Sequence, residues 1–144
     1  MDKPIRPTLH HLTFVVRSLE ESVPRWRSLL GDPVAFEDLP ARGVRTARFA
    51  LGGSWVVLVE PTGADGVPAE HLARHGEGLL LMSVGVESLD AVVSHLASEG
   101  IEPSGPRRAG LQGWQLQDLA RGPFNGVQVQ LCAADPSGQA TQGR

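Results

Sequence analysis

The sequence predicts an α+β fold built from two tandem βαβββ modules. An apolar strand, a helix and three short strands follow one another over residues 9–61, and the same order returns over residues 79–133. Residues 16–21 are matched by residues 86–91, with Ser-Leu at the start of each expected helix. Residues 62–78, rich in glycine, proline and charge, form the predicted linker. We therefore expect a single domain with an internal repeat.

The first module begins with a strand over residues 9–16. Apolar residues then recur at helical spacing and form one stripe, Leu19, Val23, Trp26, Leu29 and Leu30. Ser18 is placed to cap this helix, with Glu21 three residues later, and Gly31 is placed to end it. Three strands are predicted next, over residues 33–38, 44–51 and 54–60, the last two joined by a Gly52-Gly53 turn.

The second module repeats this order. A strand over residues 79–86 leads to Ser88, which is placed to cap a helix that ends at Gly100. The expected inward residues of this helix are Leu89, Val92, Val93 and Leu96. Strands are predicted over residues 101–104, 114–119 and 126–132. Two such modules can each form a half-barrel, and together they can leave a concave cup lined by alternate strand residues.

Composition favours a globular protein whose partner is a small molecule. The 144 residues carry 13 basic and 16 acidic side chains, and the net charge of -3 argues against a nucleic-acid partner. The single cysteine, Cys132, excludes an intrachain disulfide framework. No apolar run reaches about 18 residues and no signal-peptide pattern opens the chain, so we expect a cytoplasmic protein with no membrane partner. Residues 1–8 and 134–144 are expected to be loose ends.

Several short motifs together resemble the vicinal oxygen chelate superfamily. They are Leu9-x-His11-Leu12, Leu29-Leu30-Gly31, Leu51-Gly52-Gly53, Leu58-Val59-Glu60-Pro61, Gly76-Glu77-Gly78 and Gly126-Val127. The resemblance covers residues 9–133, and within the superfamily the chain looks most like methylmalonyl-CoA epimerases, with glyoxalase I and bleomycin-resistance proteins as cousins. It implies a glyoxalase-like cup and a homodimer.

The resemblance also implies a metal site, but most of its ligands are missing here. Carried over by position, the family's four ligands fall on His11, Val57, Leu81 and Gln130. Valine and leucine have no donor atom, and an amide oxygen is a poor ligand. Since a catalytic divalent ion needs about three protein ligands, we expect no metal and no other cofactor.

The two proton-transferring glutamates of the epimerases are missing as well. By the same resemblance their positions fall on Thr46 and Gln130, and neither side chain can exchange a proton at neutral pH. An enolate formed from a thioester would also lack the metal that stabilises it. Ordinary methylmalonyl-CoA epimerase activity is therefore not expected.

Strand alternation predicts what lines the cup instead. The predicted lining consists of His11, Thr13, Thr46, Arg48, Trp55, Val57, Leu81, Ser83, Gln115, Gln117, Gln128 and Gln130. This set mixes apolar and hydrogen-bonding side chains, which suits a bulky organic molecule with a few polar groups. Trp55 is either a wall on which the ligand stacks or part of the core. Val127, Val129 and Leu131 are predicted to pack under the second helix.

Three of the lining residues are candidate catalytic groups. His11 is the obvious proton-transfer group, and the alternative is a hydrogen-bonded, inert histidine. Arg48 is placed to hold a carboxylate or an enolate, unless it faces solvent at a strand edge. Gln130, together with Gln128, is expected to contact ligand or water. We interpret Cys132 as a small buried hydrophobe rather than a nucleophile.

Three functions remain open at this point. The first is a metal-independent enzyme, an isomerase, cyclase or lyase, that acts on a small organic, polyketide-like or thioester substrate, as in natural product biosynthesis. A shaped pocket can accelerate such a reaction by holding a reactive conformer. The second is a metal-free binding protein that sequesters an antibiotic or a similar metabolite. The third is an epimerase-like enzyme with a displaced metal site.

Overall fold

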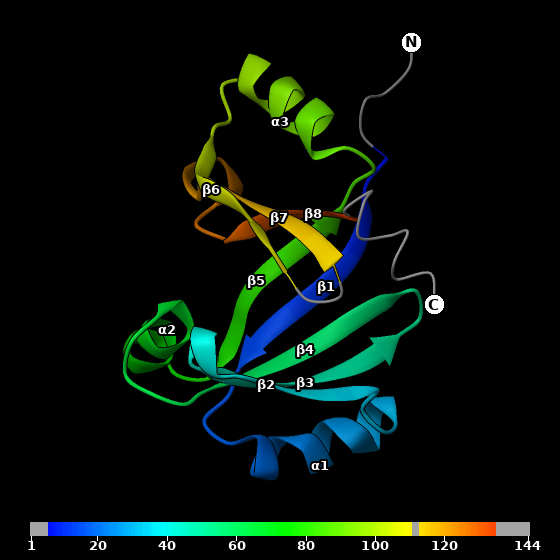
Figure 1. Cartoon of the computed structure of the whole chain (residues 1–144), viewed down its shortest axis with the longest axis vertical. Helices are drawn as coiled ribbons and strands as arrows, with labels where there is room; N and C mark the ends of the chain where they lie inside the picture. The colour runs from blue at the N-terminus through cyan, green and yellow to red at the C-terminus, as the bar shows by residue number, and fades with distance from the viewer. Residues whose placement is uncertain (1–5, 111–112, 135–144) are drawn as a thin grey trace. The chain divides into compact units, whose positions relative to one another are not determined.

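The computed structural model describes residues 6–110 and 113–134, and these form eight β-strands and three α-helices (Figure 1). They divide into two compact units. The N-terminal unit runs from His11 to Leu81, and the C-terminal unit contains the described residues up to His10 and from Met82 onward. The α+β fold class is confirmed. Residues 1–5 and 135–144 of the expected loose ends lie outside the described residues, while Thr8 begins β1 and Ala134 ends β8.

The N-terminal unit has its predicted strands and first helix in the predicted order, with two further short helices, one between the second and third strands and one in the predicted linker. They are β1 (Thr8–Val15), α1 (Leu19–Leu30), β2 (Ala35–Leu39), the short 3-10 helix η1 (Pro40–Arg42), β3 (Val44–Leu51), β4 (Ser54–Pro61) and α2 (Val67–His75). The strands lie in the order β2-β3-β4-β1, where β1 is parallel to β4 and the other neighbours are antiparallel. β1 therefore pairs with the last strand of its own module.

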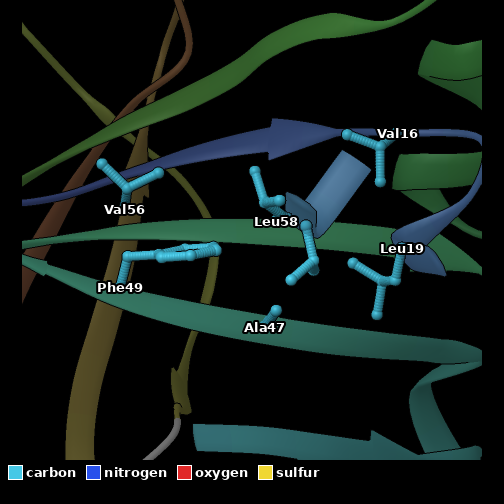
Figure 2. Packing of buried hydrophobic residues seen from close by; sticks show 7 residues of the cluster. Val16, Leu19, Ala47, Phe49, Val56 and Leu58 are labelled. Atoms are coloured by element: carbon cyan, nitrogen blue, oxygen red, sulfur yellow. The ribbon is translucent and has the colours of Figure 1, made fainter. Parts of the chain in front are cut away.

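The position of α1 is set by its two ends and its apolar stripe. The Ser18 hydroxyl accepts a hydrogen bond from the Glu21 N–H at 3.1 Å, and the Glu60 carboxylate accepts one from the Leu19 N–H at 3.2 Å. Gly31 ends the helix at φ 88°, where a side chain would be strained. Leu19, Val23, Trp26 and Leu30 of the predicted stripe pack on the apolar face of β3 and β4, around Phe49 and Leu58 (Figure 2). Leu29 was expected in the same stripe but is 75% exposed and takes no part in this cluster.

The C-terminal unit repeats this arrangement. Its elements are β5 (Gly78–Gly85), α3 (Leu89–Ser98), β6 (Pro103–Ala109), β7 (Trp114–Leu119), the 3-10 helix η3 (Gly122–Phe124) and β8 (Val129–Ala134). The strand order is β5-β8-β7-β6, with β5 parallel to β8. The Ser88 hydroxyl accepts from the Ala91 N–H at 3.1 Å, which is the same cap that Ser18 makes on α1. The predicted internal repeat is thus present down to its capping residues.

Two strands of the C-terminal unit differ from their predicted bounds. β6 was expected over residues 101–104 and instead covers Pro103–Ala109, a fully exposed strand whose apolar signal is weak. The last strand was expected from residue 126 and instead begins at Val129. Asn125 and Gly126 both have positive φ, at 61° and 81°, so they turn the chain before the ladder can start. Val127 is accordingly 40% exposed and does not pack under α3.

Each unit covers one face of its sheet with a helix. In the N-terminal unit, α1 packs on the face that carries Phe49, Val56 and Leu58. In the C-terminal unit, α3 packs on the face that carries Val129 and Leu131, as predicted. Side chains alternate along a strand, so every second residue points to the opposite face, away from α1 in the N-terminal unit and away from α3 in the C-terminal unit.

We expect Phe49→Ala to lower the free energy of unfolding by about 3–5 kcal/mol, because it leaves a cavity under α1. Phe49 is fully buried. Phe36→Ala is the matched control, since Phe36 is 60% exposed and its loss should change stability by less than about 0.5 kcal/mol. Urea unfolding of both variants measures the difference, and equal losses would contradict the packing described for α1.

Candidate functional site

The sheet face of the N-terminal unit that lies opposite α1 gathers six of the predicted site residues. The β1–β4 register places His11 opposite Trp55 and Thr13 opposite Val57. The β3–β4 register places Arg48 opposite Val57 as well. Paired residues direct their side chains to one face of a sheet, so these side chains form adjacent rows. Thr46, two residues from Arg48, belongs to the same face.

Most of this face is buried although it is rich in polar groups. His11 and Thr13 are each 6% exposed, and Thr46 is 4% exposed. Between them lies a small apolar cluster of Val44, Val57 and Val59, against which Trp55 packs. Buried polar side chains are stable only when they have partners, so this face is organised around specific contacts.

Arg48 is the residue on this face whose buried charge lacks partners, since two of its donors have no polar partner among the described residues. The side chain is 6% exposed, and its Nε and Nη1 have no hydrogen-bond partner among the described residues. The guanidinium carbon lies 4.8 Å from the ring centroid of Trp55, a cation–π contact that orients the group. Leaving a buried charged donor unsatisfied costs about 1–3 kcal/mol or more. Arg48 thus keeps two buried donors that no described residue satisfies.

Glu37 is a carboxylate on this face that the sequence analysis did not single out. The β2–β3 register places Glu37 opposite Thr46, and its side chain is partly buried. Along β2 the residues Ala35, Glu37 and Leu39 are partly buried while Phe36 is exposed, so Glu37 shares the face of Arg48. The alternation of partly buried and exposed residues along β2, combined with its register against β3, is the sequence feature that could have identified Glu37.

The residues present do not fit the metal site of the family. Among the described residues, no three His, Cys, Asp or Glu side chains are grouped so that they could hold a metal ion. The second ligand position falls on Val57, which is 4% exposed inside an apolar cluster and flanked by Arg48 and Thr13. Leu81, at the third position, is a partly buried residue of β5. A cationic guanidinium beside the position would repel a metal ion.

The C-terminal unit carries a second group of polar residues on the sheet face away from α3. Gln130 lies opposite Ser83 on β5 and opposite Asp118 on β7. The Gln130 side chain is 2% exposed, and its Nε2 donates to Asp118 Oδ1 at 3.4 Å. Arg108 donates to both oxygens of Asp118, at 2.7 and 3.4 Å. The Oε1 of Gln130 has no hydrogen-bond partner among the described residues.

The other glutamines on β7 that were predicted to line the cup lie on a different face from Gln130. Gln115 lies opposite Ala133 and Gln117 opposite Leu131, so both point to the face away from Gln130. The prediction that they line the cup beside Gln130 is wrong, because antiparallel register pairs Gln130 with Asp118 instead, and a shift of one residue reverses the face. The Gln117 Nε2 donates to the backbone carbonyls of Ser104 and Gly105.

Gln128 lies before β8 and its amide is fully engaged. Its Nε2 donates to the carbonyls of Leu119 and Val129, both at 3.2 Å, and its Oε1 accepts from Arg121 Nε at 3.1 Å. These bonds hold the turn between β7 and β8. Of the glutamines proposed as ligand contacts, only Gln130 keeps a buried atom that is unpartnered among the described residues.

Cys132 shares the face of Gln130 but stays a neutral thiol. It is 1% exposed, and burial raises its pKa from 9.0 to about 12, a shift that the adjacent Ser83 hydroxyl opposes only in part. A thiol with this pKa has almost no thiolate at neutral pH and is a poor nucleophile. This agrees with its interpretation as a small buried hydrophobe.

The sequence model of the glyoxalase/bleomycin resistance protein/dioxygenase superfamily matches residues 10–116. Among solved structures, a hypothetical protein, BH1468, from Bacillus halodurans C-125 is 25% identical, with a TM-score of 0.84 over 90% of this chain and 95% of that one. Methylmalonyl-CoA epimerase from Mycobacterium tuberculosis is 24% identical, with a TM-score of 0.81 over 92% and 91% of the two chains.

A Streptomyces coelicolor methylmalonyl-CoA epimerase variant in complex with 2-nitronate-propionyl-CoA is 25% identical, with a TM-score of 0.78 over 88% of this chain and 96% of that one. No curated protein matches the chain. No helix of the described residues is long and apolar enough to cross a membrane.

We expect the stability of the protein to fall as the pH rises above 9.0 toward 12, in part because the unfolded Cys132 thiol ionises while the folded one does not. The folded pKa is the higher one, so the contribution is complete below 9.0 and is lost on the alkaline side. Cys132→Ala should show a shallower decline of unfolding free energy between about pH 8 and 10.5. Identical slopes for the two proteins would contradict this assignment.

Proposed function

Given that the chain belongs to the glyoxalase/bleomycin resistance protein/dioxygenase superfamily, we propose that it is a metal-independent enzyme that binds a small organic anion. The reaction is an isomerisation, cyclisation or elimination that passes through an enolate. The substrate carries a carboxylate, a thioester or a polyketide-like carbonyl group. We propose that the enzyme works as a homodimer.

The observation that carries the proposal is Arg48. Its Nε and Nη1 are buried donors without a partner among the described residues, and Trp55 holds the guanidinium from one side. A carboxylate or an enolate oxygen would satisfy these donors in a charge-assisted pair. Arg48 would thereby supply the stabilisation of negative charge for which the epimerases of the family rely on a metal ion.

His11 is the proposed proton-transfer group. It is buried on the same sheet face as Arg48, in the row of Trp55. In an isomerisation its neutral imidazole would take a proton from the carbon next to the carbonyl, and the electron pair of the broken C–H bond would move onto the carbonyl oxygen. The same imidazolium would return the proton to a different position. Among the described residues, Glu37 is the second side chain on this face, after His11, that could act as a base.

A binding protein that sequesters its ligand is the second candidate. The apolar cluster of Val44, Val57 and Val59 beside Trp55 offers the ligand a surface without any reacting group. An epimerase-like enzyme with a displaced metal site is the third. For that reading the described residues supply no group of three candidate ligands.

We expect Arg48→Met to weaken the binding of methylmalonyl-CoA by about 10–100-fold, the value of a charge-assisted hydrogen bond, and to leave propionyl-CoA, which lacks the free carboxylate, unaffected. Methylmalonyl-CoA is the probe because an epimerase of similar structure binds it. Titration calorimetry measures both ligands. The melting temperature should stay equal or rise, because an unpaired buried charge is removed.

Arg45→Met is the matched control for this experiment. Arg45 is half-exposed and pairs with Asp38 and Glu60 at 3.7 and 3.6 Å, on the same strand as Arg48. This variant should keep the preference for the carboxylate-bearing ligand. If Arg48→Met instead lowers the melting temperature and leaves the ligand preference intact, Arg48 is structural and the proposal fails.

We expect solvent deuterium to enter C2 of methylmalonyl-CoA without inversion of C2, because His11 as a single base would remove and return the proton on one face of the enolate. The rate should be the same before and after exhaustive treatment with a chelator, and His11→Ala should lower it by about 10²–10⁴-fold. Mass spectrometry follows the exchange, with elemental analysis of the purified protein alongside. Near-stoichiometric metal whose removal stops exchange would contradict metal independence. Tight binding without exchange favours the sequestering protein, and loss of exchange in Glu37→Gln but not in His11→Ala moves the base to Glu37.

A further inference from the structure

Three residues of the C-terminal unit form a chain of hydrogen bonds that ends at a buried oxygen. Arg108 donates to both carboxylate oxygens of Asp118, at 2.7 and 3.4 Å. Asp118 in turn accepts from Gln130 Nε2 at 3.4 Å. At the end of the chain, Gln130 Oε1 is buried and has no hydrogen-bond partner among the described residues.

The chemistry of Asp118 decides which way the Gln130 amide faces. An amide can turn over and exchange its oxygen for its nitrogen, and the two are nearly equal in size. A carboxylate that is paired with a guanidinium can only accept hydrogen bonds, so the atom facing Asp118 has to be the NH2 group. The Oε1 is thereby directed away from Asp118 as an acceptor.

The neighbours of Gln130 leave this acceptor available. Ser83 lies opposite Gln130 on β5 with no exposed surface, yet its hydroxyl does not donate to Oε1. Cys132 follows two residues later as a neutral thiol. A buried carbonyl oxygen without a donor destabilises the folded protein, and a donor on a ligand would remove that penalty.

We infer that Asp118 is a positioning residue that holds Gln130 as a hydrogen-bond acceptor, so that the ligand bound there presents an O–H or N–H donor. This inference rests on the proposed function in so far as Gln130 contacts a ligand. The internal repeat gives it a counterpart. Asp118 and Gln130 occupy the paired positions that Arg48 and Val57 occupy in the N-terminal unit. Within the described parts of the chain, Arg48 keeps donors without a partner in one unit, and Gln130 keeps an acceptor without a partner in the other.

Asp118→Asn tests the inference, with phenol and anisole as the probes. Phenol offers an O–H donor, and anisole offers only an acceptor. In the native protein we expect phenol to shift the side-chain amide resonances of Gln130 and to bind about fivefold more tightly than anisole, the value of one hydrogen bond. The asparagine introduced by this substitution can donate as well as accept, so the Gln130 amide becomes free to turn over. The preference should then fall to less than about twofold.

Two further variants separate positioning from structural support. Asp90→Asn is the matched control, because Asp90 pairs with Arg107 at 2.9 Å in the same unit but is exposed, and it should leave the preference unchanged. Gln130→Met removes the amide at similar volume and should abolish the preference. If Asp118→Asn fails to fold, Gln130→Met decides alone.

A fivefold preference that persists in Asp118→Asn or in Gln130→Met overturns the inference. So does a native protein in which neither probe shifts the Gln130 amide, since the oxygen would then face water or protein only. These outcomes are independent of the Arg48 experiments. If the protein prefers phenol but its binding of CoA esters does not depend on the carboxylate, the proposed function is wrong and this inference stands. If binding depends on the carboxylate but phenol is not preferred, the proposed function stands and this inference is wrong.

Discussion

Strand register, the pairing of each residue with its neighbour across the sheet, controls the chemistry of both units. In each unit, one sheet face is committed to a helix, as Phe49 and Leu58 are to α1 and Leu131 is to α3. Because side chains alternate, the opposite face receives every remaining residue of the same strands. Register then decides which of these residues become neighbours, so that Arg48 meets Val57 and Asp118 meets Gln130.

Burial makes the polar groups on these faces chemically distinctive, because it removes the water that would otherwise satisfy them. A guanidinium at the surface would be solvated, but Arg48 has buried donors that no described residue pairs, next to an aromatic ring. The same principle keeps the Cys132 thiol neutral and leaves one oxygen of Gln130 unsatisfied. Buried polar groups without partners are costly, and proteins keep them where a ligand completes them. Among the described residues, the N-terminal unit has unpaired donors on Arg48, and the C-terminal unit has an unpaired acceptor on Gln130.

Under the proposed function, Arg48 would take over a role that a metal ion plays in the epimerases. A divalent cation stabilises an enolate by its charge, and a buried, pre-oriented guanidinium can do the same without a set of anionic ligands. Val57 takes a ligand's position and contributes to an apolar cluster instead. If Arg48 supplies the positive charge, as proposed, the neighbouring residues would not need the negative charges that hold a metal ion.

The order of the strands and of the two capped helices, and the caps at Ser18 and Ser88, could be predicted from the sequence, because they depend on local periodicity and on residue chemistry. Which side chains meet across the strands was decided by folding. Gln115 and Gln117 alternate as a lining strand should, yet pairing with β8 directs them away from Gln130. Glu37 likewise shows its place only against the neighbouring strand β3. Pairing across strands joins residues distant in sequence, so no local pattern contains it.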